Sequence, residues 1–190
     1  MFWDSQFVGV SAVRADVFLT QLVALLRWNM NTNEAQFGVE CLKALLVPSD
    51  INNQPKITIE QFGSFCAFFG PLIAPWVPKP NGGDIDLLNR MVSLLSRVWY
   101  HGDISAEECS RRLNSMPIGS FLVRHSSSTR GNYAISKVSS NGIAHLRVQR
   151  DENGFFVVFN GQILRGDSII SLLELHGRTL GLQFACAGSQ

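Results

Sequence analysis

The sequence is poor in cysteine, and the cysteines it has are far apart. Structural zinc sites and disulfide frameworks need cysteines that are closely grouped or regularly spaced. No Cys-x-x-Cys pair occurs, so we expect no metal site, no disulfide bond and no zinc-dependent ubiquitin-ligase activity. Reduced thiols are typical of the cytoplasm, where we expect this protein to act. The four cysteines are Cys41, Cys66, Cys109 and Cys186.

Charge of one sign and long apolar runs are also missing. Charged residues make up 16% of the chain and the formal net charge is +1, so bulk charge does not favour nucleic-acid binding. No apolar run approaches the ~18 residues of a membrane span, and no basic-then-apolar leader opens the chain. We expect a globular, soluble, monomeric protein that binds neither nucleic acid nor membrane.

The signature sequences of common enzyme classes are absent as well. The chain has no Gly-x-Ser-x-Gly, no P-loop, no kinase catalytic loop and no His-Cys-x5-Arg phosphatase sequence. Each of these motifs places a nucleophile or a phosphate-binding backbone where the chemistry needs it. We therefore expect a binding protein without enzymatic activity and without a cofactor.

The first half of the chain is predicted to be helical. Apolar residues recur there at three- and four-residue spacing, which is typical of helices with one buried face. Prolines and glycines gather at 75–83, which predicts a linker. We expect a helical domain over 1–98 and a second domain over 99–190. The predicted helices span 11–30, about 33–47, a segment that carries Phe62 to Phe69, and Asp84–Val98.

The second half is predicted to form a sheet. Short apolar runs separated by Asn-Gly turns indicate antiparallel strands. Ser105 and Glu108 form a capping box that opens a short helix. The predicted fold class is α+β: an antiparallel sheet flanked by two helices, preceded by an all-α domain. The predicted strands are Ser120–His125, Asn132–Val138, Ile143–Arg150 and Phe155–Phe159, and the last helix is Asp167–His176.

Arg124 is the most informative single residue. It follows the apolar run Phe121-Leu122-Val123, so its guanidinium is expected in or beside a core. A buried cation needs a partner, and the residues that follow supply hydroxyls but no acid. An external phosphate would suit a forked guanidinium beside hydroxyl and N–H groups. The alternative is an arginine that extends from the strand end to the surface.

Three separated motifs together resemble the Src-homology-2 (SH2) family of phosphotyrosine-binding domains. They are Trp99-Tyr100-His101-Gly102, Phe121-Leu122-Val123-Arg124 and His145-Leu146-Arg147, in the order and at the spacing of that family. The resemblance covers Trp99 to about Cys186. It implies an adaptor or regulator of intracellular signalling whose partners are tyrosine-phosphorylated proteins.

The resemblance also implies a role for each residue of the pocket. Arg124 matches the arginine that binds the phosphate at the pocket floor, and His145 and Arg147 match residues beside the phosphotyrosine ring. The loop after Arg124 would surround the phosphate with hydroxyls and N–H groups. The loop residues are Ser126, Ser127, Ser128 and Thr129, and the residues expected to contact the rest of the peptide are Leu146, Gly161, Ile163 and Leu180.

One position departs from the family pattern. Many members carry a basic residue on the first helix that also binds the phosphate, whereas this chain has Ala106, followed by Glu107 and Glu108. We expect Arg147 to supply the missing charge, with Arg130 of the loop as the alternative.

The helical half resembles, more distantly, the EF-hand-like and linker segments of Cbl and STAT proteins. A calcium loop would begin at Asp50, with Asn52 and Gln54 as ligands. However, Pro55 stands where glycine is needed, and Gln61 stands where a bidentate glutamate is needed. We therefore expect a degenerate EF-hand without calcium.

Two other functions stay open. A STAT-like transcriptional regulator would dimerise through its phosphotyrosine module, which requires a phosphorylatable tyrosine beyond that module. The chain has only Tyr100 and Tyr133, both inside it, which disfavours this function. The chain could also be a fragment of a larger signalling protein.

Overall fold

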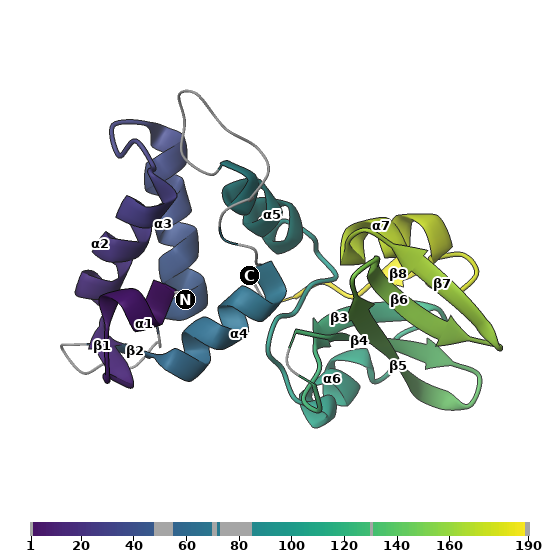
Figure 1. The fold of residues 1–190 in the computed structure, drawn as a ribbon. Helices are drawn as coiled ribbons and strands as arrows, with labels where there is room; N and C mark the ends of the chain where they lie inside the picture. Colours follow the sequence, from purple (N-terminus) through teal and green to yellow (C-terminus); the bar gives the residue numbers. More distant parts are fainter. Residues whose placement is uncertain (1, 48–54, 70–71, 73–84, 130, 189–190) are drawn as a thin grey trace. The chain divides into compact units, whose positions relative to one another are not determined.

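The chain divides into two compact units. A computed structural model describes residues 2–47, 55–69, 72, 85–129 and 131–188 (Figure 1). The units are Met1–Ser93 and Leu94–Gln190, so the boundary precedes the one expected at Val98–Trp99. The predicted linker at 75–83 lies outside the described residues. Among the helices that are described, none combines the length and apolar character needed to span a bilayer.

The N-terminal unit contains two helix–strand–helix segments. Its two short strands pair antiparallel, with Ala12 opposite Thr58 and Arg14 opposite Lys56, and this ladder joins the segments. The prediction of a helical N-terminal region is confirmed, with an added two-stranded sheet. The elements are α1 (Phe2–Gln6), β1 (Ala12–Arg14), α2 (Ala15–Leu26), α3 (Asn33–Leu46), β2 (Lys56–Thr58) and α4 (Ile59–Phe69); α5 (Ile85–Leu95) contains the boundary between the units.

Several predicted helix boundaries in this half are wrong. Residues 12–14 form an extended strand, so the helix expected over 11–30 begins only at Ala15, and α1 was not predicted. The strand β1 forms because its backbone pairs with β2, more than 40 residues later in the chain. The spacing of apolar residues in a local window cannot reveal a partner that far away. The last helix ends at Leu95 rather than Val98, and its predicted cap Asp84 lies outside the described residues.

Aromatic rings form the core of the N-terminal unit. The centroids of Phe18 and Phe62 are 5.1 Å apart at a steep angle, and those of Trp3 and Phe18 are 5.5 Å apart. Edge-to-face contacts of this kind add to the stabilisation from burial. The indole of Trp3 also donates a hydrogen bond to the Val10 carbonyl (2.8 Å). The aromatic residues of α1 and α4 therefore hold the two segments together.

Gln61 caps helix α4. Its Oε1 accepts a hydrogen bond from the Thr58 N–H (2.7 Å), and its own N–H donates to Thr58 Oγ1 (3.2 Å). This reciprocal arrangement is a capping box. The other proposed loop positions, Asp50, Asn52 and Gln54, lie outside the described residues. In the parts of the chain that are described, no group of three His, Cys, Asp or Glu side chains could hold a metal ion.

The C-terminal unit is built on a six-stranded sheet of order β7-β6-β5-β4-β3-β8. Neighbouring strands are antiparallel except β8, which runs parallel to β3. Helices α6 and α7 flank the sheet, which confirms the predicted α+β class (Figure 1). The bounds are α6 (Ala106–Leu113), β3 (Ser120–His125), β4 (Tyr133–Ser139), β5 (Gly142–Asp151), β6 (Gly154–Phe159), β7 (Gln162–Gly166), α7 (Ile169–His176) and β8 (Phe184–Ala185).

The register of β3, β4 and β5 decides which side chains share a face. Arg124 lies opposite Ala134, and Ala134 lies opposite Arg147. Cross-strand partners point to the same face of a sheet and alternate residues point to opposite faces. The neighbouring row on that face carries Leu122 and His145, and Leu122 packs with α6 in a core cluster. One sheet face therefore carries both the α6 core and the predicted pocket.

His125 lies on the opposite face from Arg124, among tyrosines. Its Nε2 is hydrogen-bonded to the Tyr100 hydroxyl (2.6 Å), and its ring lies 6.0 Å from that of Tyr133. Burial lowers the pKa of His125 to about 4 from its ordinary 6.5, although Asp103 opposes the shift. The imidazole is therefore neutral in the folded protein at pH 7.

We predict that acid destabilises the fold through His125. The unfolded chain takes up a proton near pH 6.5, and the folded chain does so only near pH 4. The free energy of unfolding should therefore fall as pH is lowered through this window, by at most about 3 kcal/mol from this residue. Urea unfolding of the full chain at pH 7 and pH 5 measures the loss. His125→Gln should make the dependence shallower; an unchanged slope would contradict the assignment.

Candidate functional site

Arg124 is buried at the end of β3, with 5% of its surface exposed. Its Nη1 donates a hydrogen bond to the His125 carbonyl (2.9 Å), and its Nε has no hydrogen-bond partner among the described residues. None of the ion pairs found among the described residues includes Arg124. The arginine therefore does not extend to the surface, and part of its donor capacity is unused.

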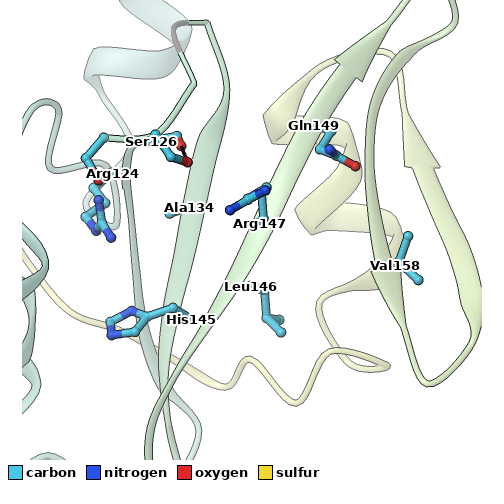
Figure 2. Close-up of a pocket in the computed structure, with 10 residues that line it drawn as sticks. Arg124, Ser126, Ala134, His145, Leu146, Arg147, Gln149 and Val158 are labelled. Atoms are coloured by element: carbon cyan, nitrogen blue, oxygen red, sulfur yellow. Dashed lines mark hydrogen bonds between the residues drawn. The ribbon is translucent and has the colours of Figure 1, made fainter.

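A pocket of about 660 Å³ opens over Arg124 (Figure 2). Arg147 faces it from β5, and the small side chain of Ala134 between the two arginines leaves the floor open. Two arginines and no carboxylate are among the described residues that line it, so the pocket favours an anion. The lining residues are Arg124, Ser126, Ser127, Ser128, Ala134, His145, Leu146, Arg147, Gln149 and Val158.

A tight loop brings hydroxyls to the pocket rim. The Ser126 N–H donates to the Asn132 carbonyl (2.9 Å), and the Asn132 N–H donates to the Thr129 carbonyl (3.3 Å). These bonds close the loop and place the Ser126 and Ser128 hydroxyls 3.2 Å apart. Ser126, Ser127 and Ser128 line the pocket, whereas Thr129 is exposed and does not. Arg130 lies outside the described residues.

His145 forms one wall of the pocket. Its Nδ1 is hydrogen-bonded to the hydroxyl of Ser136 (2.8 Å), a buried residue of β4. Burial lowers the pKa of His145, and the nearby Arg124 cation lowers it further. The ring is therefore held in position as a neutral imidazole, and the positive charge of the pocket comes from the arginines.

The residues expected to contact the rest of a peptide are dispersed. Leu146 lines the pocket. Gly161, at the turn between β6 and β7, and Ile163 of β7 are both exposed and do not line it. Leu180 is fully buried, so its side chain cannot contact a peptide in this structure. Sequence reasoning missed Ala134, Gln149 and Val158 as lining residues. In the sequence Val158 looks like any apolar residue of a strand. In the structure it is 57% exposed and lines the pocket from β6.

The acids of the first helix are turned away from the pocket. Glu108 accepts hydrogen bonds from Arg112 (2.7 Å) and Arg111 on its own helix, and these bonds lower its pKa. Neither Ala106 nor Glu107 is among the lining residues. The described part of α6 therefore contributes no charged side chain to the pocket.

The sequence of this chain is similar to a protein family and to several known proteins. The family model described as "SH2 domain" matches residues 99–176. Two curated proteins of Dictyostelium discoideum are similar over most of this chain. They are "Dual specificity protein kinase shkA", 38% identical over 85% of this chain, and "Dual specificity protein kinase shkC", 33% identical over 93%. The chain spans 29% and 35% of these relatives, about a third of their length.

A solved structure extends the comparison to the helical half. The "Inactive choanoflagellate E3 ubiquitin ligase Cbl TKB" matches with a TM-score of 0.54, at 19% identity, over 100% of this chain and 48% of its own. At this identity the likeness concerns the fold alone, and it is consistent with the distant resemblance of the helical half to Cbl proteins. The match to the family model and the α+β fold of the second unit lead to one identification: residues 99–176 of this chain are an SH2 domain.

Proposed function

We propose that the C-terminal unit captures tyrosine-phosphorylated peptides through the pocket over Arg124. The observation that carries the proposal is the buried guanidinium with an unpartnered Nε beneath an open pocket. A buried cation without an acid is costly unless a ligand supplies the opposite charge. A phosphate does so with several acceptor oxygens, and a guanidinium can bind two of them at once.

The depth of the site favours phosphotyrosine over other phosphorylated side chains. Arg124 is only 5% exposed, whereas Ser127 and Ser128 of the loop and Arg147 of β5 are exposed around the same pocket. A phosphate must be carried on a long, rigid side chain to reach it, and the phenyl ring of tyrosine provides that length. Phosphoserine would hold its phosphate nearer the peptide backbone and leave Arg124 unpaired.

The other residues of the site are expected to contact either the phosphate or the phenyl ring. Ser126, Ser127 and Ser128 offer hydroxyls and N–H groups to the phosphate oxygens, and Thr129 keeps the loop closed through its carbonyl. His145 supports the ring of the phosphotyrosine from the side. Arg147 can lie against the ring face or reach the phosphate, and it takes the place of the cation that Ala106 does not supply.

We further propose that this binding unit serves as an adaptor or regulatory module in cytoplasmic signalling. The relatives named as dual specificity kinases match this chain over only a third of their length, which favours a recognition module of a larger signalling protein. Dimerisation of the STAT type has less support, because the Tyr100 hydroxyl is engaged by His125 and Tyr133 is buried. Neither offers an accessible acceptor for a kinase.

Replacing Arg124 tests the proposal directly. Arg124→Ala should weaken binding of a fluorescent, sequence-degenerate phosphotyrosine peptide pool by about 2–5 kcal/mol, or ~30-fold or more, because the buried charge contact is lost. Anisotropy measures the affinity, with the unphosphorylated pool as reference. Arg124→Lys keeps the positive charge but loses the planar guanidinium that can donate two parallel hydrogen bonds, so this variant should also bind the phosphorylated pool weakly.

The exposed Arg178→Ala provides the matched control, and it should bind like the wild type. Circular dichroism confirms that each variant is folded. Equal affinity of wild type and a folded Arg124→Ala variant for the phosphorylated pool would disprove the pocket assignment.

A second comparison asks which cation replaces the missing one of the first helix. Arg147 lines the pocket, so Arg147→Ala should weaken binding of the same phosphorylated pool more than Arg130→Ala does. We expect a loss of about 0.5–2 kcal/mol for Arg147, in the range of a cation over an aromatic ring. The reverse order of the two variants would assign this role to the loop.

A further inference from the structure

The loop after β3 presents serine hydroxyls both to solvent and to the pocket. Ser127 and Ser128 are exposed, and both also line the pocket over Arg124. The hydroxyl oxygen of Ser128 lies 3.2 Å from that of Ser126, which is partly buried in the same lining. Ser128 can therefore be reached from solvent, while its side chain contacts the pocket lining.

Backbone hydrogen bonds keep this loop at the pocket. The Ser126 N–H donates to the Asn132 carbonyl (2.9 Å), and the Asn132 N–H donates to the Thr129 carbonyl (3.3 Å). These bonds hold the backbone on both sides of Ser128. A group attached to the Ser128 oxygen would therefore stay at the rim of the pocket.

The pocket holds positive charge that no acid of its own lining compensates. The Nε of Arg124 has no hydrogen-bond partner among the described residues, Arg147 is exposed, and no described lining residue is a carboxylate. A phosphoserine carries close to two negative charges at pH 7 and three strong acceptor oxygens, which suit a guanidinium. A phosphate on Ser128 would thus meet the same attraction as the phosphate of a ligand.

We propose that Ser128 is a phosphorylation site, and that its modification closes the pocket to phosphotyrosine. The proposal rests on the function proposed above, since capture of phosphotyrosine is what the modification blocks. The co-reactant is ATP held by a serine/threonine kinase. The Ser128 oxygen attacks the γ-phosphorus and forms an O–P bond, while the bond from that phosphorus to the β–γ bridging oxygen breaks. ADP leaves, and the hydroxyl proton passes to the base of the kinase.

Two effects of the attached phosphate act in the same direction. It pairs with the arginines of the pocket, and its charge repels the incoming phosphate dianion. A phosphoserine of a bound peptide is held away by the peptide backbone, whereas Ser128 belongs to the pocket lining itself. A bound phosphotyrosine peptide should in turn cover Ser128 and slow its phosphorylation.

The first test uses the full chain with phosphoserine installed at position 128 by codon suppression. Anisotropy with the phosphotyrosine peptide pool should show binding weakened about tenfold or more relative to the unmodified chain. Removal of the phosphate by a serine-specific phosphatase, which is then itself removed, should restore the affinity, and a merely misfolded chain would not recover. If the modified chain does not fold, Ser128→Glu decides in its place and should weaken binding about threefold.

Phosphoserine at position 140 provides the matched control. Ser140 is exposed in the turn between β4 and β5 and does not line the pocket. It lies about 20 Å along the strand from Ala134, well beyond the ~8 Å over which salt screens charge. This chain should bind within about twofold of the unmodified one. Unchanged affinity of the chain modified at 128, or equal weakening by both modifications, would overturn the proposal.

The second test asks whether Ser128 accepts a phosphate. The folded wild-type chain is incubated with MgATP and a panel of purified serine/threonine kinases, with and without a saturating phosphotyrosine peptide pool. Mass spectrometry should find phosphate on Ser128, reduced severalfold by the pool and absent from Ser128→Ala. Phosphate at no loop serine, or only at Ser127, would overturn the assignment. Failure of the underlying function is distinct, because then the unmodified chain would not prefer the phosphorylated pool over the unphosphorylated one.

Discussion

The buried guanidinium of Arg124 is the constraint on which the arrangement of the C-terminal unit depends. Among the described residues, its guanidinium donates a hydrogen bond to the carbonyl of His125, so the end of β3 must be held in place. The Val123 N–H donates to the Trp99 carbonyl (2.8 Å), and the His125 N–H donates to the Gly102 carbonyl (2.7 Å). The motif at 99–102 is therefore the backbone support of Arg124, which explains why the two motifs occur together.

Local sequence signals predicted four of the six strands of this unit and missed β7 and β8. Apolar runs and Asn-Gly turns predicted β3 to β6. The pocket residues came instead from the resemblance to the SH2 family: most of the phosphate-site residues it named line the pocket, whereas Thr129, Gly161, Ile163 and Leu180 do not. The burial of Leu180 was not predictable, because it depends on a loop held by a lysine of β4. In the other unit, β1 has only three residues, too few to show the alternation of apolar and polar residues that indicates a strand. Its partner β2 is distant in sequence, so β1 was not predicted.

Glu108, Arg111 and Arg112 of helix α6 are bonded to one another, and none of them lines the pocket. The charges that line the pocket therefore come from the strands of the sheet. Glu108 is bonded to Arg111 and Arg112, and Arg112 also donates to Nδ1 of His101 (2.8 Å). Because His101 must accept this bond, its Nε2 donates to the Cys186 carbonyl (2.9 Å), and burial lowers the pKa of the ring. These groups stabilise the contact between α6 and the C-terminal segment without contributing to the pocket.

Strand β4 determines the shape of the pocket over Arg124. Ala134 and Ser136 face the pocket side, where one leaves space and the other fixes His145, while Lys137 faces the opposite side. Since side chains alternate along a strand, a change of register by one residue would exchange both sets at once. The pairing of β4 with β3 and β5 therefore fixes the open floor at Ala134 and the position of His145 together, and a change of register would lose both.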